Sequence, residues 1–218
     1  MPLLEKYIED TYSWAVWKVE ESCEELQKFF DKDYTEELQK FSLESRRKDF
    51  LVARLLIKLL TGKEIEIYYE SSGKPIICDN HFQVSISHTK SYVAVITHTT
   101  QAVGIDIERI SPRILKIKNR FLSETELTQI DKKNEIIYLL LCWSAKESMF
   151  KVLGETDVIF SEHLHLAPFS IQEDLCIKSF ESRTSTRKKF NIYYKIFDDF
   201  VLTMISGENI SEYQLNRK

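Results

Sequence analysis

The chain has 218 residues, of which 43% are hydrophobic and 29% are charged, and its formal net charge is −4. This composition is typical of a globular protein and excludes wholesale disorder and collagen-like or linker-dominated architecture. A mildly acidic chain is also unsuited to coating nucleic acid, so we expect no nucleic-acid partner. The length suffices for one large domain or two small ones.

The cysteines and the apolar segments indicate a cytoplasmic protein. Four cysteines lie far apart with no Cys-x-x-Cys pair: Cys23, Cys78, Cys142 and Cys176. They indicate neither a zinc ribbon nor a redox motif, and reduced thiols are the simplest interpretation. The first residues include Glu5, Glu9 and Asp10 and lack the layout of a signal peptide. The most concentrated apolar stretch, residues 136–145, has about half of the roughly 20 residues that span a bilayer.

Residues 18–61 are predicted to form helices. An amphipathic pattern covers residues 19–30, and a break follows it. A second helix is predicted from Thr35, or more firmly from Leu43, to residue 60, because its apolar positions recur every three or four residues. Gly62 stands where a glycine commonly ends a helix.

Strands and helices alternate in the remainder of the chain. Runs rich in Ile, Val and Tyr predict strands at residues 65–69, 82–87, 92–97 and 102–108, with a turn at 72–75. A capping box at residues 123–126 opens a short helix, and a longer helix is predicted over 135–153, ended by Gly154. The last third returns to strands, at residues 175–180, 190–197 and 200–205.

A weak internal repeat relates residues 82–96 to residues 190–204, at an offset of 108 residues. Two half-buried hairpins also resemble one another by chance, so the repeat alone is not decisive. A helix followed by strands, twice, predicts an α+β fold rather than a doubly wound parallel sheet. We therefore expect two similar α+β halves, residues 1–104 and 105–218, with a cleft between them.

Two acidic residues mark the strand at residues 103–108. Strand alternation places Asp106 and Glu108 on one face and turns Ile105 and Ile107 to the other. Gly104 permits close approach of a backbone or a ligand. Neighbouring carboxylates repel unless a cation lies between them, and hard oxygen ligands favour Mg²⁺. A solvent-exposed acidic strand face is the alternative.

The helix at 135–153 carries a second candidate group. Trp143, Glu147 and Lys151 share one helical face. The alternative is an ordinary surface ion pair between Glu147 and Lys151, but this is the most apolar helix of the chain, where a charged pair is costly to hold. A third candidate is Ser87-His88 at the end of a strand, where both side chains can donate to a phosphate oxygen. Alone, that pair is weak evidence.

Taken together and in order, these motifs resemble those of the 4'-phosphopantetheinyl transferase superfamily. They are Gly-Lys-Pro at 73–75, Ile-Ser-His at 86–88, Gly-Ile-Asp-Ile-Glu at 104–108, Arg-Phe-Leu-Ser-x-x-Glu at 120–126 and Trp-Ser-x-Lys-Glu-Ser-x-x-Lys at 143–151. The resemblance is stronger to the two-half, surfactin-synthetase-activating type, and it covers about residues 46–154. It implies two halves related by pseudo-twofold symmetry, with the active site in the cleft between them.

The resemblance implies an enzyme that uses coenzyme A and Mg²⁺. The phosphopantetheine arm moves to a serine hydroxyl of an apo-carrier protein, and 3',5'-ADP leaves. By similarity, Asp106, Glu108 and Glu147 would bind the metal, and Glu147 could also accept the serine proton. Lys151 would contact the phosphate oxygens, and Lys146 is a weaker candidate for that role. Asp106 would also contact the cofactor through its bound metal.

The remaining cofactor contacts also come from the resemblance. Lys74, Ser87 and His88 match nucleotide-binding positions of the family. A basic helix start implies an arginine on the 3'-phosphate of coenzyme A, for which Arg47 is the first choice, with Arg46 and Arg54 behind it. A solvated helix face is the alternative interpretation of this basic run.

A basic segment provides a hypothesis for the partner surface. Residues 109–122 hold five basic residues and no acid: Arg109, Arg113, Lys116, Lys118 and Arg120. Such a local excess of positive charge could steer an acidic carrier protein toward Asp106 and Glu108. A solvated loop and helix would have the same composition. The two-half layout suggests a monomer.

Two other functions stay open at this stage. A Mg²⁺-dependent phosphodiesterase or nuclease could use the same acids, although the glutamate–lysine spacing differs from that of restriction-type nucleases and broad positive charge is missing. A non-catalytic binding protein could retain the fold, but the loss of a metal carboxylate would mark it and all three are present. His163 and His165 are interpreted as ordinary surface residues.

Overall fold

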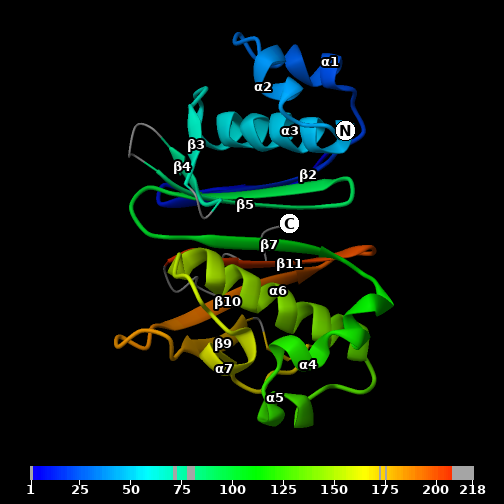
Figure 1. The fold of residues 1–218 in the computed structure, drawn as a ribbon, viewed down its shortest axis with the longest axis vertical. Coiled ribbons are helices and arrows are strands. Elements are labelled where there is room, and N and C mark those ends of the chain that lie inside the picture. Colours follow the sequence, from blue (N-terminus) through cyan, green and yellow to red (C-terminus); the bar gives the residue numbers. More distant parts are fainter. Residues whose placement is uncertain (1, 71–72, 78–81, 172, 175, 208–218) are drawn as a thin grey trace. The chain divides into compact units, whose positions relative to one another are not determined.

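The computed structural model describes residues 2–70, 73–77, 82–171, 173–174 and 176–207. The chain divides into two compact units, Met1–Ala102 and Val103–Lys218. Each unit combines helices with an antiparallel sheet, in agreement with the predicted α+β class (Figure 1). Parts of three predicted features lie outside the described residues: Ser72 of the turn, Cys78 of the cysteines and Leu175 of a strand.

The first unit is built on a four-stranded sheet covered by one long helix. Its strands, in spatial order, are β1 (Leu3–Ile8), β2 (Tyr12–Lys18), β6 (Tyr92–His98) and β5 (Gln83–Thr89). Helix α3 (Glu44–Thr61) lies across one face of this sheet, with the short helices α1 (Cys23–Gln27) and α2 (Thr35–Gln39) beyond it (Figure 1). A separate hairpin consists of β3 (Ile67–Tyr69) and β4 (Pro75–Ile77).

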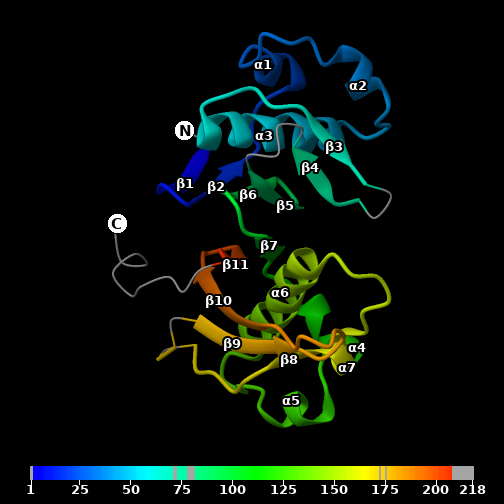
Figure 2. The same cartoon turned by 90° about the vertical axis from the view of Figure 1, so that its left-hand side faces the viewer.

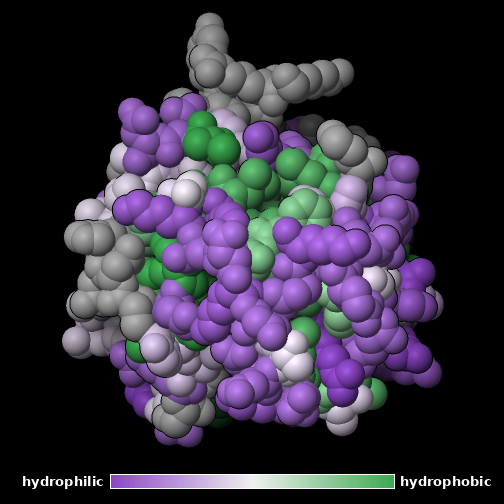
Figure 3. All heavy atoms as spheres, turned by 90° about the horizontal axis from the view of Figure 1, so that it is seen from above, coloured by the Kyte–Doolittle hydropathy of each residue, from purple (hydrophilic) through white to green (hydrophobic). Residues whose placement is uncertain are grey.

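The apolar face of α3 explains how this unit is held together. Leu51 and Leu56 of α3 are fully buried and belong to one hydrophobic cluster with Val93 and Val95 of β6. The helix ends at Gly62, which has the left-handed φ of 74° that favours glycine, so the predicted end of the helix is confirmed. The outer face over the helical layer is largely hydrophilic (Figure 3).

The second unit is a five-stranded sheet with a long helix across one face (Figure 2). Its strands, in spatial order, are β7 (Gly104–Arg109), β11 (Phe200–Ile205), β10 (Lys189–Ile196), β9 (Cys176–Glu181) and β8 (Leu164–Leu166). The covering helix is α6 (Glu135–Leu153). Short helical segments complete the unit: η1 (Pro112–Lys116), α4 (Lys118–Phe121), α5 (Glu124–Thr128) and α7 (Phe160–His163).

Helix α6 packs unusually close to β7. A Cβ atom added at Gly104 would overlap the backbone oxygen of Ser148 and lie 2.9 Å from Val152. Only glycine allows this approach of helix and strand, as the sequence predicted for this position. The contact brings the acidic strand and the Trp143–Lys151 face of the helix together.

The predicted elements differ from the observed ones mainly near the N-terminus. The predicted helix over residues 19–30 is wrong in length, because α1 covers only Cys23–Gln27. Strands β1 and β2 were not predicted. Strand β2 is buried along almost its whole length, so its sequence lacks the alternation of polar and apolar residues that marks a half-exposed strand. Within the described part of the chain, no helix is long and apolar enough to cross a membrane.

Candidate active site

The acidic strand β7 presents its carboxylates to helix α6. Asp106 and Glu108 alternate with Ile105 and Ile107, both of which are buried. In the antiparallel register Asp106 lies opposite Thr203 of β11, a residue that contacts α6. Asp106 and Glu108 therefore lie on the sheet face covered by the helix, and the alternative of a solvent-exposed acidic face is wrong.

Two side chains of α6 bind these carboxylates directly. The indole Nε1 of Trp143 donates to Glu108 Oε1 at 2.7 Å. Lys151 Nζ donates to Asp106 Oδ1 at 2.9 Å and to the backbone oxygen of Ile105 at 2.8 Å. The ion pair of Lys151 is thus with Asp106 across the packing interface, and the surface pair with Glu147 that helical spacing allowed is absent from the ion pairs of the described residues.

Burial and mutual repulsion disfavour charge on two of the three carboxylates. Desolvation, with added repulsion from Asp106, raises the pKa of Glu108 to about 7. The same two causes raise the pKa of Glu147 to about 7, against the opposing effect of Lys151. The negative charge that the three acids would carry is therefore not fully compensated by nearby positive charge.

The donor set suits a hard cation, although it is not arranged around one point. Among the described residues, no group of three or more His, Cys, Asp or Glu side chains is spaced so that it could already hold a metal ion. Carboxylate oxygens are the ligands that Mg²⁺ prefers, and a divalent cation would offset the repulsion that raises the pKa of Glu108 and Glu147. By the chemistry of their donors, Asp106, Glu108 and Glu147 fit such an ion.

The raised pKa values predict how stability depends on pH in the absence of a divalent cation. Folded Glu108 and Glu147 keep their protons up to about pH 7, whereas both carboxyls titrate near 4.5 when unfolded. Between these values the folded state binds more protons, so the free energy of unfolding falls as the pH rises. We expect a combined loss on the order of 2–4 kcal/mol for the coupled pair.

Urea unfolding with a chelator at pH 5.5 and pH 8 measures this loss. The double variant Glu108→Gln/Glu147→Gln should be more stable than the wild-type protein at pH 8 and close to it at pH 5.5. A stability difference between the two proteins that does not change with pH would contradict the prediction.

Lys146 has a structural position and does not face the acids. Its side chain is fully buried, and Nζ donates to Phe121 O at 2.7 Å, Glu126 Oε2 at 2.7 Å and Phe160 O at 3.1 Å. Glu126 in turn accepts from the backbone N–H of Leu166 and, in the confirmed capping box, of Ser123. All three protons of the ammonium group are used in these hydrogen bonds. The prediction that Lys146 could contact phosphate oxygens as a weaker candidate beside Lys151 is therefore wrong.

In the first unit, a cavity of about 280 Å³ gathers part of the predicted nucleotide site. His88 lines it together with Arg46, Asp49, Phe50 and Tyr69. Arg46 Nη1 lies 2.5 Å from Nε2 of His88, and Asp49 Oδ2 is 3.9 Å from both side chains. The arginine that lies beside His88 is thus Arg46, which sequence reasoning ranked below Arg47.

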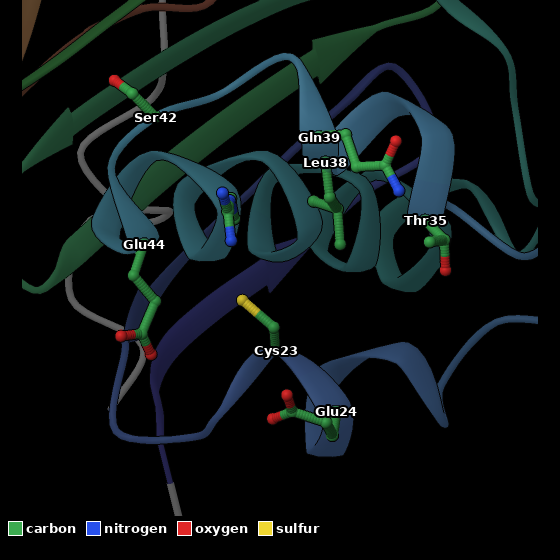
Figure 4. A pocket seen from close by; sticks show the side chains of 8 residues that line it. Cys23, Glu24, Thr35, Leu38, Gln39, Ser42 and Glu44 are labelled. Atoms are coloured by element: carbon green, nitrogen blue, oxygen red, sulfur yellow. The ribbon is translucent and has the colours of Figure 1, made fainter.

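Arg47 and Arg54 lie elsewhere in the first unit. Arg47 donates through Nε to Phe41 O at 2.9 Å and lines a second cavity of about 380 Å³. Figure 4 shows this cavity between α1, which carries Cys23, and α2 and α3. Arg54 is buried, with its guanidinium 3.4 Å from the centre of the Phe50 ring. Its contacts are those of a core residue.

The two other predicted cofactor residues are separated from this arrangement. Ser87 is buried and, as the neighbour of His88 on β5, points to the opposite face of the sheet. Lys74 lies in the turn between β3 and β4, where its backbone oxygen accepts from Glu70 N at 3.0 Å. Neither residue lines the cavity that holds His88.

The histidines set aside in the sequence have local partners. His163 Nδ1 accepts from the backbone N–H of Ile159, and His165 Nε2 lies 2.9 Å from Ser182 Oγ. The ring of His165 also stacks on Phe180, with centroids 4.5 Å apart. Both residues are half-buried, so the interpretation as ordinary surface residues holds only in part, and each has a structural contact.

Four of the five residues in the basic segment are exposed. Lys118 is partly buried and its Nζ donates to Glu135 Oε1 at 3.0 Å, which neutralises its charge. For Arg113 and Lys116, no ion pair occurs with any of the described residues. The exposed positive charge of the segment is therefore carried by residues other than Lys118: Arg109, Arg113, Lys116 and Arg120.

The acidic strand β7 and the lysine-bearing helix α6 together form a site of a recognisable chemical class. Asp106 is buried, Glu108 and Glu147 are half-buried, and Lys151 lies within 3 Å of Asp106. Carboxylates of the Mg²⁺-binding type beside a lysine are suited to reactions of phosphate groups. Comparison with known proteins is more specific. Residues 102–205 match the family described as the 4'-phosphopantetheinyl transferase superfamily. This segment includes Asp106, Glu108, Glu147 and Lys151.

Curated relatives point the same way. The chain is 36% identical over 102 residues to 4'-phosphopantetheinyl transferase Sfp of Bacillus subtilis (strain 168), which is 44% of each chain. It is 33% identical over 113 residues to 4'-phosphopantetheinyl transferase gsp of Aneurinibacillus migulanus, covering 49% of this chain and 46% of the relative. A third relative, psf-1 of Bacillus pumilus, is 31% identical over 144 residues, 61% of each chain.

These matches show that residues 102–205 are similar to the 4'-phosphopantetheinyl transferase superfamily, and the matched relatives include the Sfp-like type. The family resemblance expected from the sequence motifs is thereby confirmed. In the first two of these alignments the chain spans about half the length of the curated relatives.

Proposed function

We propose that this protein is a 4'-phosphopantetheinyl transferase of the holo-[acyl-carrier-protein] synthase kind. It transfers the phosphopantetheine arm of coenzyme A, in a Mg²⁺-dependent reaction, to a serine hydroxyl of an apo acyl, peptidyl or aryl carrier protein. The observation that carries the proposal is the contact of Lys151 with Asp106, beside Glu108 and Glu147, within the segment that matches the family.

The reaction exchanges one bond to phosphorus for another. The serine oxygen forms a bond to the phosphorus nearer to pantetheine, the pyrophosphate P–O bond breaks, and 3',5'-ADP leaves. Glu147 accepts the serine proton as the general base. Lys151 binds a phosphate oxygen. Bound to Asp106, Glu108 and Glu147, Mg²⁺ would offset the charge that develops on the pyrophosphate.

Coenzyme A also needs contacts for its nucleotide half. We propose that the cavity with Arg46 and His88 binds the 3'-phosphate, because an arginine and an imidazole can both donate to its oxygens. The aromatic rings of Phe50 and Tyr69 in the same cavity suit a base. The sequence-based choices of Arg47, Arg54, Lys74 and Ser87 as cofactor residues, and of Asp106 and Lys151 at the pyrophosphate, stay predictions.

We retain as a proposal that the chain consists of two related halves with pseudo-twofold symmetry and the active site between them. Each unit has the same order of elements: a strand, a long helix and a hairpin, namely β2, α3, β5–β6 and then β7, α6, β10–β11. In each sheet the strand and the second hairpin strand are neighbours, β2 beside β6 and β7 beside β11. This parallel supports an internal repeat. The cytoplasmic, monomeric state expected from the sequence stays a prediction.

The basic segment is proposed to attract the acidic carrier protein. Arg113→Glu/Lys116→Glu should raise the carrier KM about tenfold at low salt, because electrostatic steering mainly affects encounter. The kcat and the KM for coenzyme A should not change. Steady-state kinetics beside the control Lys188→Glu/Lys189→Glu, which makes the same charge change, checks this. An unchanged carrier KM, or an equal rise in the control, would contradict the assignment.

Release of 3',5'-ADP tests the proposed function against its main rival. The protein is incubated with coenzyme A, with and without Mg²⁺ and an apo-carrier, and nucleotide products are separated by chromatography. A transferase releases 3',5'-ADP only when both are present. Release without a carrier would support the phosphodiesterase considered above, and binding of coenzyme A without release by any carrier would support a non-catalytic binding protein.

A further inference from the structure

Three buried hydroxyl groups meet between α6 and the sheet of the second unit. Thr203 Oγ1 on β11 lies 2.8 Å from the Oγ atoms of both Ser144 and Ser148, which are one turn apart on α6. Ser144 Oγ is also 3.3 Å from the backbone oxygen of Asp106, and Ser148 Oγ is 3.3 Å from that of Thr203. All three residues have an exposed fraction of 0%. The hydroxyls thus connect α6 to β11 and to β7.

The three protons can be assigned as one continuous chain of hydrogen bonds. Each hydroxyl donates once and can accept more than once. If Ser148 donates to Thr203, Thr203 to Ser144, and Ser144 to the Asp106 carbonyl, every proton is used and every hydroxyl has a partner. Hydrogen bonds that point the same way along a chain strengthen one another. The chain therefore favours one register of helix on sheet.

This network lies where the candidate active site is assembled. Thr203 is directly opposite Asp106 in the strand register. Ser144 follows Trp143, and Ser148 follows Glu147, so both serines are adjacent to side chains of the site. The backbone of Ser148 is also the group that approaches Gly104 most closely. A shift of α6 at this point would move Glu147 and Lys151 relative to Asp106.

We propose that Thr203 is a positioning residue that fixes α6 on β7 and β11, so that Glu147 and Lys151 stay opposite Asp106. Three neighbouring carboxylates repel one another, and that repulsion acts to separate the helix from the strand. The hydroxyl chain, which joins α6 to the Thr203 side chain of β11 and to the Asp106 carbonyl of β7, opposes the separation. The consequence for catalysis rests on the proposed function, whereas the consequence for cation binding does not.

Thr203→Val tests the proposal, because valine keeps the shape of threonine and removes the hydroxyl. Thr203→Ser, which restores it, is the rescue variant. Ser179→Ala is the matched control, since Ser179 is buried in the same unit but its Oγ contacts the backbone oxygen of Phe190. Titration calorimetry measures Mg²⁺ binding without coenzyme A, and steady-state assays give kcat and KM.

For Thr203→Val we expect about tenfold weaker Mg²⁺ binding and about tenfold lower kcat, with little change in either KM. Thr203→Ser and Ser179→Ala should bind Mg²⁺ as the wild-type protein does. If Thr203→Val does not fold, Ser144→Ala serves in its place with the same expectation. Mg²⁺ affinity that is unchanged in a less stable Thr203→Val protein would overturn the proposal and show a purely structural role.

The two readouts separate the proposal from the proposed function. Weaker Mg²⁺ binding in Thr203→Val, in a protein that modifies no carrier, would support the positioning role and contradict the transferase. If Thr203→Val binds Mg²⁺ normally and the wild-type protein transfers phosphopantetheine, the positioning role is contradicted and the transferase function is supported. Absence of Mg²⁺ binding by the wild-type protein would overturn the positioning proposal.

Discussion

Glu147→Gln is expected to lower the kcat of phosphopantetheine transfer by about a thousandfold. Glutamine has nearly the shape of glutamate but carries no charge and cannot accept the serine proton, so the variant loses both proposed roles of the residue. Because burial and Asp106 already raise the pKa of Glu147 to about 7, the neutral side chain should not destabilise the fold. The expected protein is therefore folded and inactive.

The assay compares wild-type protein, Glu147→Gln and the control Glu124→Gln with Mg²⁺, coenzyme A and an apo-carrier. Glu124 is exposed on α5, so its variant should retain wild-type rates. Thermal melting at pH 8 confirms that Glu147→Gln is folded. A folded variant with more than a tenth of the wild-type kcat would contradict the proposed catalytic role of Glu147.

Lys146→Met is expected to cause the largest loss of stability, about 3–5 kcal/mol, because it leaves a buried charge without its partner. Lys146 and Glu126 form a buried pair at 2.7 Å, and Glu126 also accepts from the backbone N–H groups of Ser123, the N-cap of α5, and Leu166 of β8. Burial lowers the pKa of Lys146, as expected for an ammonium group taken out of water. The measurement is urea unfolding of the variant and wild-type protein.

A double variant distinguishes the pair from simple packing. Lys146→Met/Glu126→Gln removes both charges and should be more stable than Lys146→Met alone, since no unpaired carboxylate remains. Lys189→Met, at an exposed lysine of β10, should be close to wild type. The loss of stability caused by Glu126→Gln alone is measured as well. If the double variant is less stable than Lys146→Met by that same amount, the two side chains are not coupled.

Local signals in the sequence predicted the elements that depend on local interactions. The helix at residues 135–153 and the strand at residues 200–205 have the predicted bounds, and Gly154 has the expected left-handed φ of 63°. The capping box of Ser123 and Glu126 is also present. Strands β1 and β2 could not be found in this way, because they are defined by pairing with one another and with β6, which follows much later in the chain.

The candidate site was predictable as two faces but not as an assembled group. Alternation placed Asp106 and Glu108 on one face of a strand, and helical spacing placed Trp143, Glu147 and Lys151 on one face of a helix. Nothing in those spacings says that the two faces meet. The bonds from Trp143 to Glu108 and from Lys151 to Asp106 are therefore findings of the structure.

Other residues were misplaced or missed for the same reason. Lys146 and Lys151 belong to one motif, but only tertiary packing buries the first and leaves the second at the acids. Thr203 lies more than 50 residues from Ser144 and Ser148, and a lone threonine in an apolar strand carries no signal for function. Arg46 and Arg47 are neighbours in the sequence, but their side chains line different cavities, and the sequence does not show which cavity each one lines.

Phosphopantetheine transfer is measured as the intact mass of an apo-carrier protein after incubation with this protein, coenzyme A and Mg²⁺. The expected result is a mass gain equal to one phosphopantetheine, located on a single serine by fragmentation and abolished by a chelator. Several apo-carriers of the acyl, peptidyl and aryl types are included. No gain on any carrier under conditions where coenzyme A binds would contradict the claim that this site transfers phosphopantetheine.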